Sequence, residues 1–201
     1  MAKLAKTTSM ANRSYLYTTD NYTANDDEFT ALGLSEYAHE ISYLHQLMVA
    51  YDAKSIKSLI FEEEEETAVV ANFEKGKQLV IDYLKMVLAL VPDLMEEGFT
   101  SFVDDTITFL NSRKEKYALL ELGEIYDLDD EDVKVQHEEF FNENRNISRE
   151  AVENLLERFN KGEVNAENLS EDDEEILSVL AEEELTGFWS ETLYYDLSGA
   201  E

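Results

Sequence analysis

Residues 73–91 read FEKGKQLVIDYLKMVLALV, and the rest of the fold can be built around this stretch. Its second half is apolar on nearly every side, and its polar residues recur at helical spacing on one narrow stripe, namely Lys75, Gln78, Asp82 and Lys85. The pattern predicts a buried central helix with Leu84 and Val87 deep in the core. A bilayer span is excluded, because it needs about 20 mostly apolar residues without charges and Asp82 and Lys85 lie mid-segment.

The whole chain has 201 residues, enough for one sizeable core, and its 44% hydrophobic content is that of a folded protein. Its charge is unusual, since it has 46 acidic and only 16 basic side chains and its formal net charge is −30. Residues 126–201 hold 24 of the acidic side chains and five of the basic ones. Such a charge repels phosphate backbones and anionic lipid. It therefore argues against direct binding to nucleic acid or membranes, and favours a basic protein partner or solubility alone.

The chain contains no cysteine, which excludes disulfides, thiolate nucleophiles and cysteine metal sites and favours a cytoplasmic location. Residues 1–9 carry two lysines but lack the apolar run of a secretory signal, so we expect a disordered tail there. Residues 10–201 are then predicted to form a single domain whose C-terminal third is highly acidic.

Two strands and a helix are predicted before the central helix. Residues 13–19, RSYLYTT, alternate in β-favouring side chains and predict the first strand. Ser35 suits a helix N-cap, and the predicted helix runs from there to about Tyr51. Residues 67–72, TAVVAN, predict a short strand that leads into the central helix.

Helices dominate the rest of the pattern. Residues 99–112 predict an amphipathic helix, and residues 117–126, YALLELGEIY, predict a strand. Three more helices are predicted, with starts or N-caps at Asp129, Ser148 and Ser170, the last extending to about residue 184. Residues 188–195 alternate again and predict a closing strand in the same sheet as the first. The mixture indicates an α+β fold, with a small, mainly antiparallel sheet packed with several helices around the central one.

Residues 10–17, MANRSYLY, resemble the opening of a family of uncharacterised bacterial proteins. The segments GLSEY at 33–37 and LELGEI at 120–125, and the aromatic end at 189–195, are similar as well. The resemblance implies that residues 10–201 form one domain and that Met10 is the natural start. The family has no assigned activity, so it assigns no functional residue here.

Two patterns imitate metal sites. The spacing of Asp127, Asp129, Glu131 and Glu138 is that of a calcium loop, but Asp132 stands where the sharp turn needs glycine. An acidic helix N-terminus explains this segment better. Glu36-x-x-His39 would place a carboxylate and an imidazole on one helical face, but bundle metal sites need a second such pair, and no other histidine has a glutamate three residues before it. We therefore expect neither a metal nor a cofactor.

Our first hypothesis is a non-enzymatic, immunity-protein-like or inhibitor-like protein that docks on a basic partner. Carboxylates steer a basic surface into contact, and tyrosines add large contact area at low entropic cost. The expected contact residues are acidic residues of two predicted helices together with two terminal tyrosines: Asp129, Asp130, Asp172, Asp173, Glu174, Glu175, Tyr194 and Tyr195.

Two other classes of protein fit the same sequence. A DNA mimic would present the acidic helices 129–145 and 171–184 as a long, one-sided array of carboxylates. An enzyme without standard motifs would depend on carboxylates such as Glu121 and Glu124, which we expect at a sheet edge and a sheet end, on opposite sides of a strand. The sequence identifies neither the partner nor the oligomeric state.

Overall fold

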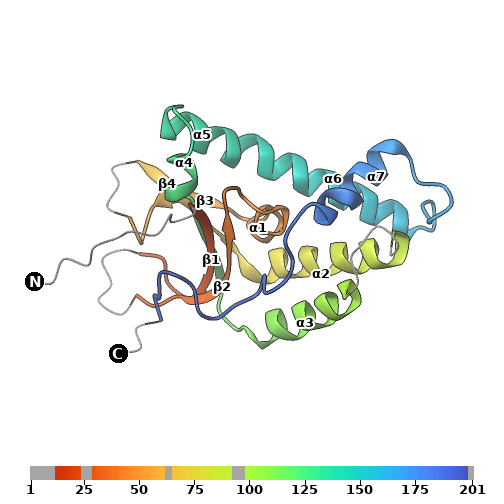
Figure 1. Cartoon of the computed structure of the whole chain (residues 1–201), viewed down its shortest axis with the longest axis horizontal. Coiled ribbons are helices and arrows are strands. Elements are labelled where there is room, and N and C mark those ends of the chain that lie inside the picture. The colour runs from red at the N-terminus through yellow and green to blue at the C-terminus, as the bar shows by residue number, and fades with distance from the viewer. Residues whose placement is uncertain (1–11, 24–28, 62–64, 92–97, 199–201) are drawn as a thin grey trace, which may run out of the picture.

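The computed structural model describes residues 12–23, 29–61, 65–91 and 98–198, which form a single α+β domain (Figure 1). The predicted tail at residues 1–9 lies outside the described residues. A five-stranded antiparallel sheet has the order β2-β1-β5-β4-β3. Its strands are β1 (Arg13–Thr19), β2 (Leu32–Ala38), β3 (Lys54–Lys57), β4 (Glu66–Asn72) and β5 (Tyr117–Glu121). The predicted fold class is confirmed, as are the strands at 13–19 and 67–72.

The predicted central helix is α2 (Phe73–Leu90), which follows directly from β4. Asn72 ends the strand and caps the helix, because its side chain accepts a hydrogen bond from the amide of Lys75 at 3.1 Å. Leu84 and Val87 are fully buried, as expected. Burying side chains of this size contributes about 1.5–3 kcal/mol each. The helix therefore anchors the main core against one face of the sheet.

Three other helices pack against α2, namely α1 (Tyr43–Met48), α3 (Phe99–Ser112) and α6 (Arg145–Asn160). The first approaches very closely, at Gly76 of α2. A Cβ atom on Gly76 would lie 1.9 Å from the backbone oxygen of Met48, so only glycine fits at this contact. The predicted helix at 99–112 is confirmed.

A long helical arm follows β5 and runs along the top of the view in Figure 1. Its parts are the short α4 (Gly123–Tyr126), α5 (Val133–Glu139), the π-helical turn η2 (Phe140–Asn144) and α6. The prediction that Ser148 starts a new helix is wrong. Ser148 lies buried inside α6 and donates its hydroxyl hydrogen bond to Gln46 Oε1 at 2.8 Å, so a tertiary contact takes the place of a cap.

The arm is followed by α7 (Glu171–Ser178) and the 3₁₀ turn η3 (Val179–Ala181). Ser170 is confirmed as the N-cap of α7, and it forms a capping box with Asp173. The regular helix ends at Ser178, short of the predicted end near residue 184.

The helix predicted from Ser35 to Tyr51 is wrong in its first half. Residues 32–38 form β2, because pairing with β1 supplies a ladder of backbone hydrogen bonds and buries Leu34. The strand ends before His39, whose φ of 70° is left-handed. Helix α1 begins only after Ser42, whose side chain accepts a hydrogen bond from the amide of Leu44.

Two later strand predictions also need correction, the first of them only in its second half. The strand predicted at 117–126 ends at Glu121 and turns into α4. The closing strand predicted at 188–195 is an irregular segment in the described structure, joined to the β2 region by hydrogen bonds from Ser190 N to Leu34 O and from Ala31 N to Leu197 O. Leu193 and Tyr195 of this segment join a small cluster on the second face of the sheet, which includes Tyr15, Tyr17 and Leu119. Phe188 and Trp189 pack with the main core instead.

Among the residues described here, no helix is both long enough and apolar enough to cross a bilayer.

Candidate functional site

The predicted acidic residues of α7 divide into two kinds. Asp173 is 2% exposed, and Arg158 of α6 donates to its carboxylate from Nη1 and Nη2, at 2.7 and 3.0 Å. The Arg158 hydrogen bonds keep the pKa of Asp173 below its ordinary value. Asp172, Glu174 and Glu175 are exposed, and they form no ion pair with any residue in the described ranges. Asp173 thus holds α7 on α6, and the side chains of Asp172, Glu174 and Glu175 face solvent.

The chain after α7 folds back toward the sheet and attaches to α1 through Glu183. The two carboxylate oxygens of Glu183 accept hydrogen bonds from the amide of Tyr43 at 2.5 Å and the hydroxyl of Ser42 at 2.8 Å. Burial raises the pKa of this carboxyl. Its neighbours Glu182 and Glu184 remain exposed. A single carboxylate therefore fixes the segment and leaves an acidic surface on either side.

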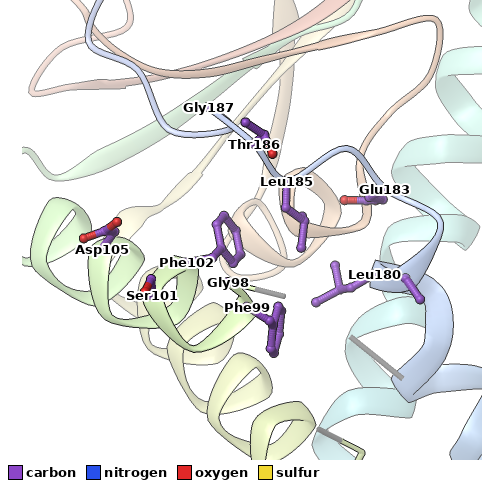
Figure 2. Close-up of a pocket in the computed structure, with 11 residues that line it drawn as sticks. Gly98, Phe99, Ser101, Phe102, Asp105, Leu180, Glu183, Leu185, Thr186 and Gly187 are labelled. Carbon is purple, nitrogen blue, oxygen red and sulfur yellow. The ribbon is translucent and has the colours of Figure 1, made fainter. Parts of the chain in front are cut away.

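A pocket of about 260 Å³ lies between this returning segment and the first turns of α3 (Figure 2). Apolar side chains from both walls point toward one another across it in Figure 2, from Phe99 and Phe102 on α3 and from Leu180 and Leu185 opposite. Asp105 and Glu183 add a carboxylate on each wall. Within the described part of the chain, no basic side chain lines the pocket. Its chemistry is therefore apolar and negative.

The second predicted acidic surface is the turn before α5. Asp129 and Asp130 are exposed there, and Asp132 caps α5 by accepting a hydrogen bond from the amide of Lys134. Two apolar side chains are also unusually exposed, Leu128 by 50% and Val135 by 47%. In Figure 1 this turn and α7 lie toward opposite ends of the helical arm. The arm from α5 to the end of α6 is about 40 Å long, at 1.5 Å per residue. The fold does not bring the two acidic surfaces together.

The two predicted tyrosines also differ. Tyr194 is 51% exposed. Tyr195 packs edge-on against Tyr15, and both hydroxyls donate to the carboxylate of Glu124, at 2.9 Å and 2.8 Å. Burial, more than the nearby carboxylate, raises the pKa of Tyr195 to about 12. Tyr195 therefore fixes the C-terminal segment through these contacts. Of the two tyrosines, Tyr194 has the more exposed side chain.

Glu121 and Glu124, the carboxylates of the enzyme hypothesis, both form hydrogen bonds that hold parts of the fold together. Glu121 is completely buried rather than at an exposed edge, because the loop after β3 covers it and the amide of Leu59 donates to its Oε1 at 2.8 Å. Glu124 lies on α4 and holds two tyrosines. Both carboxylates fix segments that are distant in sequence, so this geometry supports a structural role for the pair.

Hydrogen bonds connect Ser55, His137 and Tyr126, three residues that no sequence pattern links. Ser55 Oγ lies 2.7 Å from His137 Nε2, and the Tyr126 hydroxyl lies 3.1 Å from Nδ1. The three residues come from β3, α5 and α4, so no local spacing signals the arrangement. Burial lowers the pKa of His137. A neutral imidazole has one donor nitrogen and one acceptor nitrogen, so His137 can donate to one of these two hydroxyls and accept from the other.

Both metal-like patterns are occupied by structural contacts. Glu36 pairs with Arg13 at 3.4 Å and accepts a hydrogen bond from the amide of Tyr194 at 2.7 Å. In the calcium-like loop, Asp132 is used as a helix cap. No group of three or more histidine, aspartate or glutamate side chains is placed to hold a metal ion in the described ranges.

The fold and this acidic surface define an α+β protein with exposed carboxylates and a partly apolar pocket. The chain belongs to a family defined by a domain of unknown function (DUF7822), whose model matches residues 20–183. No curated protein and no solved structure matches the chain.

Proposed function

We propose that this protein is a binding protein that docks on a basic protein partner, as an immunity protein or inhibitor does. Its docking surface would be the α7 surface, which we define as the exposed acidic residues Asp172, Glu174, Glu175, Glu182 and Glu184 together with the pocket that residues 180–187 line. The observation that carries the proposal is the apolar pocket bordered by carboxylates that lack basic partners among the described residues. The absence of cysteine favours a reducing compartment such as the cytoplasm for this activity.

The α7 surface combines the two properties that such docking needs. Unpaired carboxylates attract a basic surface over a distance of about 10 Å at moderate salt and speed its association. Charge alone discriminates poorly between basic proteins, and tight binding depends on side chains that fill desolvated pockets. The pocket between α3 and residues 180–187 offers such a place.

The DNA-mimic alternative is less well supported by this geometry. A mimic needs a long array of carboxylates on one side, but the two acidic surfaces lie toward opposite ends of the arm. Basic side chains also lie between them. Arg149 of α6 pairs with Glu153 at 3.6 Å, and Lys161, just after the end of α6, pairs with Glu157 at 2.5 Å. A compact patch fits the arrangement better than a phosphate-like row.

The test begins with a pull-down from host lysate at physiological salt, followed by association kinetics with the basic protein recovered. The variant Asp172→Asn/Glu174→Gln/Glu175→Gln should slow association about tenfold, because it removes steering charge, and should change dissociation much less. The matched control, Asp129→Asn/Asp130→Asn/Glu131→Gln, changes the net charge equally at the other end of the arm. It should have a much smaller effect.

Three results would contradict the proposal. Equal slowing by both triple variants would show that only total charge matters. Recovery of DNA-binding proteins alone, all displaced by duplex DNA, would favour the mimic. If the pull-down recovers no basic protein, the proposal that the acidic surface docks on one is contradicted.

A further inference from the structure

We infer that the pocket between α3 and residues 180–187 receives an arginine side chain of the protein partner. This inference rests on the proposed function and adds to it the chemical identity of the anchoring contact. The argument uses the pocket lining, the charges on its walls and the way in which this chain holds its own arginines.

The lining of the pocket matches a side chain with an apolar stem and a positive head. Leu180 and Leu185 supply an aliphatic wall, and the rings of Phe99 and Phe102 stack with centroids 6.0 Å apart and planes 29° from parallel. Long basic side chains bury their methylene stems against such surfaces and keep the charge at a polar rim. A purely apolar side chain would leave the Asp105 carboxylate without a counter-charge, whereas the Glu183 carboxylate already accepts hydrogen bonds from Ser42 and Tyr43.

The electrostatic balance of the pocket is negative. Asp105 and Glu183 contribute carboxylates, and no basic side chain lines the pocket within the described residues. The opposing contribution comes from the N-terminus of α3, which starts after Gly98 and carries about half a positive charge. The exposed carboxylate of Asp105 opposes that partial charge with a larger formal charge, so a cation is favoured over an anion.

Arginine fits this setting better than lysine, because a planar guanidinium stacks on aromatic rings and pairs with carboxylates at the same time. The chain holds one of its own arginines in this way. The guanidinium carbon of Arg113 lies 4.6 Å from the centroid of the Phe109 ring, and its Nη2 lies 2.9 Å from Glu191 Oε1. The pocket offers the same pair of groups, a phenylalanine ring and a carboxylate, but no arginine of the described chain fills it.

The variant that tests the pocket is Asp105→Asn, with Asp104→Asn as its matched control. Both residues are exposed on α3 and carry the same charge, but only Asp105 lines the pocket. Glu183 is unsuitable for the test, because it also fixes the start of α1 and its loss would disturb the fold.

The first measurement uses the full chain with labelled methyl groups at Leu180 and Leu185, titrated with N-acetyl-arginine methylamide. We expect saturable shifts of both methyl resonances with a Kd on the order of 1–10 mM, as befits one isolated side chain. N-acetyl-norleucine methylamide, which lacks the charge, should give no saturable shift, and the lysine analogue should bind more weakly. Asp105→Asn should weaken arginine binding several-fold, and Asp104→Asn should leave it unchanged.

The second measurement uses the partner recovered by the pull-down. Asp105→Asn should lower the affinity of the complex about tenfold or more, because a buried arginine would lose its counter-charge, whereas Asp104→Asn should change it less than about twofold. The inference is overturned if the norleucine analogue binds as well as arginine, if lysine binds better, or if the two variants behave alike.

The two measurements also separate this inference from the proposed function. If Asp105→Asn leaves the affinity for a basic partner unchanged, the docking proposal stands and the arginine anchor is overturned. Saturable binding of the arginine analogue without any basic partner would overturn the docking proposal, and it would reassign the pocket to small organic cations.

Discussion

His45 shows at the scale of one residue how burial sets chemistry in this protein. It lies on α1 with no exposed surface, its Nδ1 lies 3.1 Å from Ser14 Oγ, and the rings of Tyr37 and Phe188 contact it. Burial lowers the pKa of this imidazole from its ordinary value of 6.5 to about 3. The folded protein therefore keeps His45 neutral across a pH range in which the unfolded chain protonates it.

This pKa shift predicts a loss of stability in acid. Below pH 6.5 the unfolded chain binds a proton at this residue that the folded chain excludes until about pH 3. The free energy of unfolding should thus fall by up to about 1.4 kcal/mol per pH unit in that window from this residue alone. Urea denaturation at pH 7, 6, 5 and 4 measures the slope.

The matched variants for this prediction are His45→Asn and His39→Asn. His39 is exposed, and asparagine tolerates its positive φ. His45→Asn should flatten the pH dependence relative to wild type, and His39→Asn should leave it unchanged. Equal slopes in all three proteins would show that carboxylates and His137, whose pKa burial also lowers, account for the acid response.

At the scale of an element, the close contact between α2 and α1 restricts which residue can stand at position 76 of α2. Gly76 lies within the helix, where alanine would normally gain about 1 kcal/mol of helix propensity. The Cβ of alanine would lie 1.9 Å from the backbone oxygen of Met48, and backbone atoms cannot move aside as a flexible side chain can. The steric cost should exceed the propensity gain.

Gly76→Ala is therefore expected to destabilise the protein by about 1–3 kcal/mol, the usual cost of overpacking a core. Lys85→Ala is the control, since Lys85 lies on the exposed stripe of the same helix and its change should stay within about 0.5 kcal/mol. Chemical denaturation of both variants gives the comparison. A Gly76→Ala protein more stable than wild type would show that α1 does not contact α2 as described.

At the scale of the whole molecule, the net charge of −30 should make stability depend on salt. Raising ionic strength from about 10 mM to about 500 mM shortens the Debye length from roughly 30 Å to a few Å and screens the repulsion among carboxylates. The melting temperature should rise across this range. The triple variant Asp172→Asn/Glu174→Gln/Glu175→Gln should show a smaller rise, and a melting temperature independent of salt in wild type would contradict the prediction.

The local parts of the fold were predictable because short-range patterns encode them. The alternation at residues 13–19, the apolar helix at 73–90 and the cap at Ser170 each depend on neighbours within a few residues. Predictions failed where a distant segment competed with a local preference. Ser35 resembles a helix cap but lies in a strand opposite Leu16, and Ser148 resembles another cap but binds Gln46.

The sequence by itself determined the class of fold, the central helix and the concentration of negative charge, because composition and periodicity are properties of the chain alone. The tertiary structure alone decided which acids remain free. It buried Asp173 against Arg158 and Glu121 beneath a loop, and it placed Asp105 in a pocket wall opposite Glu183, 78 positions further along the chain. The reason is that side-chain burial and pairing depend on packing between distant segments, which no local spacing records.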